Sequence, residues 1–373
     1  ALVDLGAVER NCARLAESLK GGAELCAVVK ADAYGHGAVP VAGAALRGGA
    51  TVLAVATAEE VAELRATYPQ ARLFTMGALS AEELDVVLAA GSELSVWREG
   101  FRALVAERAA AADVRPVVHV KHDSGMGRLG ERDAEAVLAL CDAVAADERL
   151  ELGALWTHFA TADEDGDPFL DEQLDRFLVV GERARERHPG LRLHAANSAA
   201  TLREPRAHLD MVRCGIAIYG MDPFGSDPAD HGLEPALALR SYVADVKRFR
   251  PGDSAGYGRT WRAERETWVG VLPIGYGDGL RRGLSGRAGA LIGGRRFPLV
   301  GTISMDNATV DLGPETDVEP GAEAVLLGAA GAGGDGERIL AEELASALGT
   351  INYEVTCGIS PRVPREYVGG DFA

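Results

Sequence analysis

Two of the chain's four lysines end apolar runs, a position where an amine can do chemistry. Lys30 closes the run Cys26–Val29, and Lys121 closes Pro116–Val120. Lysine and arginine together number 38 and only four are lysines, so lysine is the exceptional choice at both places. At Lys30 the pattern predicts a desolvated amine that forms a Schiff base. The alternative is a strand-end lysine that extends into solvent.

Polar and ionisable residues follow five of the eight apolar runs in the first 220 residues. These segments are Lys30–Gly37, Lys121–Arg128, Thr157–His158, Asn197–Ser198 and Arg213–Ile216. In a barrel of parallel strands, active-site residues lie at the carboxyl ends of the strands. We therefore expect these five segments to meet on one rim of such a barrel.

The spacing of the apolar runs predicts the elements that carry these residues. The runs are Leu25–Val29, Val52–Ala56, Leu73–Met76, Leu94–Trp97, Pro116–Val120, Leu152–Trp156, Leu191–Ala195 and Met211–Ile218. Segments with helical spacing separate them, and continuous apolar runs are typical of parallel strands buried on both faces. Eight strand–helix units predict an α/β fold with an N-terminal (β/α)8 barrel of the TIM type, rather than a doubly wound sheet.

The pattern changes near Leu233, where short β-type runs separated by turns begin. These runs are Tyr242–Val246, Trp268–Leu272, Gly289–Ile292, Phe297–Gly301, Thr309–Leu312 and Ala324–Leu327. We expect residues 1–232 to form the barrel and residues 233–373 a C-terminal mainly-β domain, with Gly220–Gly232 as the linker and one helix near Ala341–Leu348. The first few residues are candidates for pairing with the second domain.

Ser198, Gly215 and Ile216 suggest an anion site. Short residues near helix N-termini leave backbone N–H groups available to an anion. Barrels often place a phosphate site after their last two strands, where these residues fall. The alternative is ordinary helix capping by Ser198.

Composition excludes several classes of function. The net charge of −18 and pI near 4.9 argue against non-specific binding to nucleic acid or to an anionic membrane. No run approaches the length of a membrane span, and the first residues lack the apolar core of a signal peptide. Five scattered cysteines without a CxxC pair indicate a reducing, cytoplasmic compartment.

Three weaker patterns are set aside. Gly331–Gly336 matches G-x-G-x-x-G, but no βαβ unit can follow it. His36, His158 and His194 show no metal-ligand spacing, so we expect no metal. The arginine run from Arg281 to Arg296 indicates an interface or an entrance more than a nucleic-acid patch in so acidic a chain.

Motifs along nearly the whole chain resemble alanine racemase, the fold-type III family that uses pyridoxal 5'-phosphate (PLP). The segment AVVKADAYGHGAVP at residues 27–40 resembles the family's PLP-lysine signature. The further matches are KHDSGMGRLG (121–130), WTHFATAD (156–163), HAANSAA (194–200), MVRCGIAIYG (211–220), GYGRTW (256–261), LPIGYGDG (272–279), VGTISMDN (300–307) and INYEVTCGISPRVPR (351–365).

The resemblance implies a role for each matching residue. Lys30 would form the Schiff base with PLP, and Arg213 would face the pyridine nitrogen. An arginine there limits charge delocalisation into the ring, which restrains side reactions such as transamination. The other cofactor-binding residues implied are Tyr34, Arg128, His158, Asn197, Ser198, Gly215, Ile216 and Tyr353.

The resemblance also implies a two-base racemisation of L- and D-alanine. Lys30 would serve one face of the α-carbon and Tyr257 the other. Because an isolated tyrosine has a pKa of about 10, Tyr257 would need a neighbouring positive charge, for which His158 is the family's candidate. Tyr257 would come from the second subunit of a homodimer, together with the substrate-binding residues Met305 and Asp306.

Lys121 corresponds to a lysine that is often carbamylated in the family. The carbamate would orient Arg128, which contacts the phenolic oxygen of PLP and the substrate. A plain Lys121 paired with Asp123 is the alternative.

Thr302, Ser304 and Asn307 depart from the family's entrance segment, where Arg, Cys and Gln are usual, whereas other expected entrance residues are present. These are Asp163, Tyr276, Arg282, Ile351 and Tyr353. The departures bear on the breadth of substrates, so serine or another small amino acid stays open beside alanine.

Two other classes of PLP protein are alternatives to an alanine racemase. A PLP-dependent decarboxylase would carry an acid where Arg213 stands. A non-catalytic PLP-homeostasis protein is essentially a barrel alone, without a domain bearing Tyr257. We therefore expect a cytoplasmic isomerase that supplies D-alanine for peptidoglycan, with no partner beyond its substrate, its cofactor and a second subunit.

Overall fold

The computed structural model describes residues 1–330 and 336–370. It contains two compact units. One holds residues 8–33 and 37–224, and the other holds residues 1–7, 34–36 and the chain from Gly225 onward. All but the last residue of the glycine motif at 331–336 lie outside the described residues.

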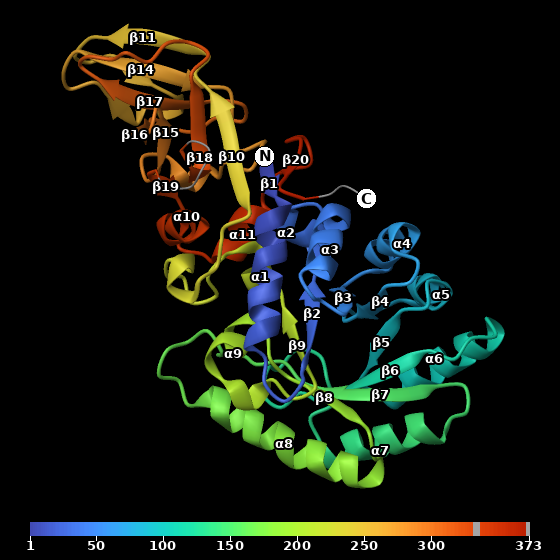
Figure 1. Cartoon of the computed structure of the whole chain (residues 1–373). Coiled ribbons are helices and arrows are strands. Elements are labelled where there is room, and N and C mark those ends of the chain that lie inside the picture. Colours follow the sequence, from blue (N-terminus) through green and yellow to red (C-terminus); the bar gives the residue numbers. More distant parts are fainter. Residues whose placement is uncertain (331–335, 371–373) are drawn as a thin grey trace. The chain divides into compact units, whose positions relative to one another are not determined.

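Eight parallel strands close into a barrel in the first unit, which confirms the predicted (β/α)8 fold (Figure 1). The closing pair joins Glu24 of the first strand to Met211 of the last. The strands are β2 (Glu24–Val28), β3 (Val52–Val55), β4 (Arg72–Thr75), β5 (Glu93–Val96), β6 (Val117–Lys121), β7 (Glu151–Trp156), β8 (Arg192–His194) and β9 (Met211–Cys214).

Helices connect the strands, and α3 to α8 lie outside them in Figure 1. The barrel strands are buried on both faces, as in β3, where all four residues are buried. Thr57 and Ser80 each begin a helix with a complete capping box. The helices are α1 (Leu5–Ser18), α2 (Lys30–Gly35), α3 (Ala38–Arg47), α4 (Ala58–Thr67), α5 (Ala81–Ala89), α6 (Glu99–Ala111), α7 (Ala134–Ala146), α8 (Phe169–Arg187) and α9 (Ser198–Arg203).

The last barrel strand is shorter than the apolar run Met211–Ile218 predicts. It ends at Cys214, and a 3-10 helix covers Ile216–Tyr219. Gly215 lies between them with φ −108° and ψ −89°, outside the strand conformation. Its N–H donates to Ser198 Oγ at 3.0 Å instead of continuing a strand ladder.

The second unit is mainly β, as predicted. Its large sheet has the order β11-β14-β17-β16-β15-β18-β10-β1-β20, with β19 paired to β18, and Figure 1 shows β11, β14 and β17 side by side. Strand β1 pairs antiparallel with β10 and parallel with β20. The strands are β1 (Leu2–Asp4), β10 (Leu237–Tyr242), β11 (Asp245–Phe249), β14 (Thr267–Leu272), β15 (Gly289–Ile292), β16 (Arg295–Val300), β17 (Ala308–Gly313), β18 (Glu323–Ala329), β19 (Arg338–Ile339) and β20 (Glu366–Val368).

Two features of this unit differ from the sequence prediction. The expected strand Tyr242–Val246 is wrong, because β10 ends at Tyr242 and β11 begins at Asp245. The chain changes strand between them, where Val243 N–H and Ala244 N–H donate to separate neighbours, Ala322 and Val271. Helix α10 (Ala341–Leu348) is as predicted, whereas α11 (Asn352–Cys357) was not foreseen. A further pair, β12 (Ser254–Ala255) and β13 (Trp261–Arg262), flanks a 3-10 turn at Tyr257–Arg259.

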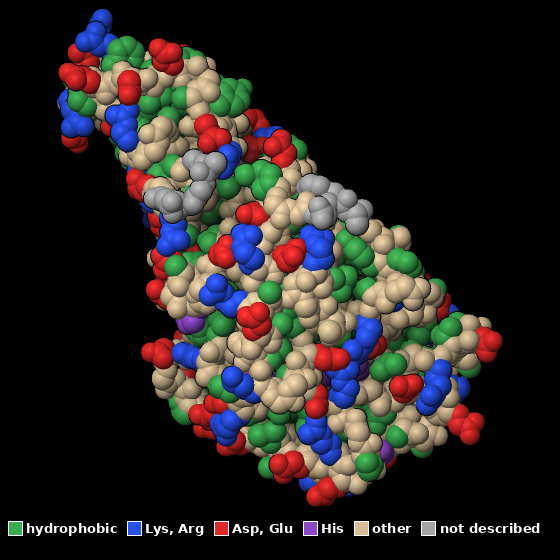
Figure 2. All heavy atoms as spheres, viewed as in Figure 1, with side chains coloured by type: hydrophobic (Ala, Val, Ile, Leu, Met, Phe, Trp, Pro, Cys, Tyr) green, Lys and Arg blue, Asp and Glu red, His purple; other side chains and the backbone are tan. Residues whose placement is uncertain are grey.

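Acidic and basic side chains are interspersed over the surface seen in Figure 2. The arginine run shows the same mixing, since Arg295 pairs with Asp317, and Arg296 pairs with Glu337 and Glu343. The last two arginines of the run are therefore paired with neighbouring carboxylates. In the described part of the chain, no helix combines the length and apolarity needed to cross a membrane.

Candidate active site

Lys30 begins α2 at the carboxyl end of β2, where the backbone is unusual. Residues Ala31–Tyr34 all have φ between 51° and 54°, in the left-handed region. For L-residues a left-handed helical conformation costs about 1–2 kcal/mol each. Four consecutive residues of this kind, none of them glycine, need other contacts to hold them, and such strain concentrates at functional sites.

Two carboxylates hold the strained turn. Glu60 Oε1 accepts the N–H of Ala31 at 2.6 Å, while its Oε2 accepts the N–H of Ala56 at 2.8 Å. Asp32 Oδ1 accepts the N–H of Ala38 at 2.8 Å. The turn that carries Lys30 is thereby tied to the starts of α4 and α3.

Cationic side chains gather around Lys30 in the barrel unit. Lys121 is 4% exposed, and its Nζ lies 4.0 Å from the ring centroid of Trp156. The guanidinium carbon of Arg213 lies 4.7 Å from the same ring. Burial, together with the charges of Arg213, Arg128 and Lys30, lowers the pKa of Lys121 to about 7. Near neutral pH the Lys121 amine is therefore partly uncharged and nucleophilic.

Arg213 lies in the barrel interior, 3% exposed. Its Nη2 donates to the carbonyls of Thr157 at 2.8 Å and Ala195 at 2.9 Å, and its Nη1 lies 2.8 Å from His194 Nδ1. Burial lowers the pKa of Arg213 to about 10, so the guanidinium is still charged near pH 7. The bonds fix the direction in which this cation points.

His158 lies next to Arg213 in the barrel unit. Its Nδ1 lies 3.3 Å from Arg213 Nη2, so the two are adjacent as expected. Desolvation and the charges of Arg213 and Arg128 lower the pKa of His158 well below its ordinary value, which favours a neutral imidazole. The charged member of this pair is therefore Arg213.

Ser198 joins the ends of the last two barrel units. Its Oγ accepts the N–H of Gly215 at 3.0 Å and of Ala217 at 3.3 Å. The residue that caps α9 is Asn197, whose Oδ1 accepts the N–H of Ala200 at 3.0 Å. The alternative that Ser198 is an ordinary helix cap is therefore wrong.

The barrel residues fit PLP. An amine at Lys30 suits its aldehyde, and the Ser198–Ile216 region gathers the polar backbone that a phosphate needs. Burial, followed by repulsion from the nearby cations Arg213 and Arg128, lowers the pKa of Lys121 in the protein alone. An anionic cofactor relieves this repulsion.

The second unit holds the remaining predicted cofactor residues, Tyr34 and Tyr353. Their ring centroids lie 5.7 Å apart. The expected entrance residues are exposed, with Asp163 in the barrel unit and Tyr276, Arg282 and Ile351 in the second unit. The predicted residues are thus divided between the two units.

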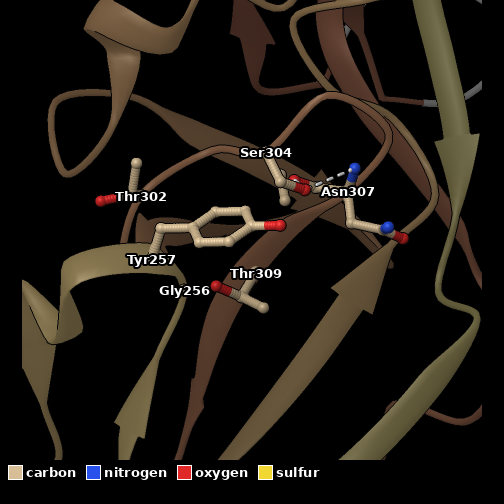
Figure 3. A pocket seen from close by; sticks show the side chains of 7 residues that line it. Gly256, Tyr257, Thr302, Ser304, Asn307 and Thr309 are labelled. Carbon is tan, nitrogen blue, oxygen red and sulfur yellow. Dashed lines mark hydrogen bonds between the residues drawn. The ribbon is translucent and has the colours of Figure 1, made fainter.

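Tyr257 lies in an open hollow of the second unit, and its side chain is 74% exposed. Figure 3 shows its ring among Thr302, Ser304, Asn307 and Thr309, with the hydroxyl directed toward Ser304 and Asn307. Gly256 has φ 72°, and a Cβ there would lie 2.7 Å from the N atom of Thr302. Only glycine at this position lets the loop approach Thr302 and present Tyr257.

The residues that depart from the family pattern form contacts around Tyr257. Ser304 Oγ donates to the carbonyl of Asn307 at 2.9 Å and accepts its N–H at 3.1 Å. Thr302 Oγ1 lies 3.1 Å from Thr260 Oγ1. Thr302 and Ser304 thus make short-range hydrogen bonds within the second unit.

The two expected substrate-binding residues, Met305 and Asp306, directly follow Ser304 in the sequence. Met305 is 52% exposed. Asp306 Oδ1 accepts from Arg362 Nη2 at 2.7 Å, and Arg362 Nε donates to Asp278 Oδ1 at 2.7 Å. Arg362 thus holds both carboxylates of this loop region.

The sequence did not identify Glu60 or Arg362, nor the role of the Trp156 ring as a contact for cations. Glu60 had a local signal, since Thr57 and Glu60 form a capping-box pattern, but its bond to Ala31 is 29 residues away in sequence. Trp156 ends the sixth apolar run, and nothing in the sequence indicates which cations contact it. Within residues 1–330 and 336–370, no group of three or more His, Cys, Asp or Glu side chains is placed to hold a metal.

We predict that Glu60→Ala destabilises the protein by about 2 kcal/mol and weakens retention of PLP, because charged acceptors of the strained turn are lost. Chemical denaturation and the absorbance of bound PLP measure the two effects. Glu59→Ala, at the exposed neighbouring position, is the control. Equal stability of both variants would show that Glu60 does not hold the turn.

Comparison with known families covers both units. The family model described as "Alanine racemase, N-terminal domain" matches residues 3–223, and "Alanine racemase, C-terminal domain" matches residues 236–367. The chain is 39% identical to the alanine racemase of Desulforamulus reducens over 98% of each chain. It is 41% identical to that of Symbiobacterium thermophilum, over 100% of this chain and 97% of the other.

Solved structures give the same result. The alanine racemase of Streptomyces coelicolor has a TM-score of 0.92 and 40% identity, covering 99% of this chain and 97% of the other. The Bacillus anthracis alanine racemase, solved with bound L-Ala-P, has a TM-score of 0.87 and 36% identity, covering 99% and 95%. With both units matched over their full length, the chain belongs to the alanine racemase family.

Proposed function

We propose that this protein interconverts L- and D-alanine with PLP as its cofactor. Family membership supports the reaction, and the observation that carries it is Lys30 at the start of the strained turn, beside buried cations. When bound, PLP withdraws electrons from the α-carbon, so that its proton can leave. The chain's own residues bind the reactants and move that proton.

Two side chains exchange the α-proton on opposite faces. Lys30 Nζ would hold PLP and serve as the base on one face, and Tyr257 Oη would serve on the other. The exposure of Tyr257 supports its acting on a substrate bound by a second copy of the chain, so we propose a homodimer with shared sites.

The other site residues are assigned to the pyridine nitrogen, the substrate carboxylate, the phosphate or the entrance. Arg213, held by His194 and two carbonyls, faces the pyridine nitrogen, and His158 lies beside it as a neutral imidazole. Met305 and Asp306 position the substrate carboxylate, with Arg128 contacting both substrate and cofactor. The phosphate is bound by Tyr34, Ser198, Gly215, Ile216 and Tyr353, and Asn197 is a further cofactor-binding residue. The entrance is lined by Asp163, Tyr276, Arg282, Ile351 and Tyr353.

Lys121 is proposed to carry a carbamate. Its lowered pKa, about 7, leaves a neutral amine that adds CO2 and releases a proton to solvent, and the product is an anion next to Arg128 and Arg213. The alternative pairing with Asp123 is weakened by the contacts of that carboxylate, which accepts the N–H groups of Gly125 and Gly127.

We further propose that the protein works in the cytoplasm and supplies D-alanine for peptidoglycan. The acidic composition and scattered, mostly buried cysteines are consistent with a reducing compartment. A domain boundary between residues 232 and 233 is also proposed.

Replacing Lys30 by alanine tests the central assignment. We expect Lys30→Ala to lose the absorbance of covalently bound PLP and essentially all racemisation. Lys20→Ala, at an exposed lysine, is the matched control and should keep both. A Lys30→Ala protein that racemises alanine at the normal rate would refute the assignment.

Tyr257→Phe should suppress proton exchange on one face only. We expect isotope exchange from solvent to differ between the L-to-D and D-to-L directions, because Lys30 still serves its own face. Tyr242→Phe, at another exposed tyrosine of the same unit, should exchange normally. Symmetric exchange at an undiminished rate in Tyr257→Phe would exclude its role.

Dilution tests the shared site. If Tyr257 acts in a partner's site, specific activity should fall over the concentration range in which sedimentation shows the dimer separating. Adding an inactive Lys30→Ala chain to Tyr257→Phe should restore activity, since mixed dimers contain one complete site. A fully active monomer would contradict the proposal.

A further inference from the structure

Four ionisable side chains form a line through the interior of the barrel. Arg213 on β9 lies with Nη1 2.8 Å from His194 Nδ1 on β8. His194 Nε2 lies 3.1 Å from His119 Nδ1 on β6. His119 Nε2 lies 2.9 Å from Glu93 Oε2 on β5, in an oblique approach.

Aromatic packing holds the two imidazoles in place. His194 and His119 are 0% and 2% exposed. Trp156 stacks on His194 with centroids 5.5 Å apart and an interplanar angle of 6°. Phe74 packs on His119 at 4.4 Å. Rings packed in this way have little room to rotate, so their nitrogen atoms keep these partners.

The two ends of the line set the direction of every bond in it. A guanidinium has only donors and an ionised carboxylate only acceptors. His194 Nδ1 must therefore accept from Arg213, which places the proton of His194 on Nε2. That proton is donated to His119 Nδ1, which leaves the proton of His119 on Nε2, facing Glu93.

The surroundings favour the charge states that this pattern needs. Burial lowers the pKa of both histidines, so both are neutral near pH 7. Burial alone would raise the pKa of Glu93, but the bond from His119 and the charge of Arg72 lower it to about 2. The line thus joins one buried cation to one partly buried anion through two neutral rings.

We propose that Glu93, His119 and His194 act as a relay of positioning residues that aims Arg213. The relay keeps an acceptor at His194 Nδ1 for the Arg213 guanidinium and supplies a compensating charge at its far end. Its effect on catalysis rests on the proposed function, because Arg213 is there assigned to the pyridine nitrogen. The existence of the relay does not rest on the proposed function.

Histidine-selective 15N NMR of the PLP-loaded protein tests the relay directly. The chain has eight histidines, which individual substitutions assign. We expect His119 and His194 each to show a protonated Nε2 and an unprotonated Nδ1. In both rings, Nε2 should donate a hydrogen bond and Nδ1 should accept one. A protonated Nδ1 on His194 would overturn the proposal, whatever the activity.

A pair of substitutions at Glu93 then separates its acceptor from its charge. Glu93→Leu removes the acceptor, so the His119 and His194 resonances should shift, and kcat should fall about tenfold with KM within about twofold. Glu93→Gln keeps an acceptor oxygen and should retain the wild-type tautomers, with a smaller loss of kcat.

Glu24→Gln is the matched control, because Glu24 accepts from the same Arg72 without contacting His119. It should leave the resonances and kcat unchanged. Unshifted histidine resonances in Glu93→Leu, or shifts equal to those in Glu24→Gln, would overturn the relay. Wild-type protein with the expected resonances but no racemisation would refute the proposed function and leave the relay standing.

Discussion

Positive charge buried at the carboxyl end of the barrel is the constraint on which the site depends. Lys121 and Arg213 lie 4.0 and 4.7 Å from the Trp156 ring centroid, and burial together with the neighbouring positive charge lowers the pKa of Lys121. Neutral histidines, backbone carbonyls and the distant carboxylate of Glu93 make this charge tolerable. The same charge makes the site receptive to an anionic cofactor.

The strained turn after β2 serves this arrangement. Its left-handed residues place Lys30 at the strand end, and contacts from Glu60 and Asp32 hold them there. A protein that only needed to connect β2 to α3 could use glycine at these positions. The strain is accordingly best explained by the need to fix the amine.

Much of the fold was predictable, because buried parallel strands read as continuous apolar runs, and eight such runs gave the barrel. The errors occurred where conformation depends on distant partners. The run Met211–Ile218 breaks at Gly215 because its N–H bonds to Ser198, and Tyr242–Val246 contains a change of strand. Apart from two glycines, nothing in the segment AVVKADAYGHG predicts the left-handed turn. Position at or near the end of an apolar run indicated Lys30, Lys121 and Arg213. A role for Tyr257 came only from family resemblance, and Glu93 and His119 act through contacts that no local pattern reveals.

The most direct test of the central claim follows the α-proton of L-alanine by NMR in D2O, with the purified protein and PLP, alongside a chiral assay of the product. The account predicts exchange of the α-proton for deuterium together with formation of D-alanine. Exchange without D-alanine would contradict the two-base assignment of Lys30 and Tyr257. If L-alanine keeps its α-proton in the presence of protein that holds PLP, alanine racemisation itself is contradicted.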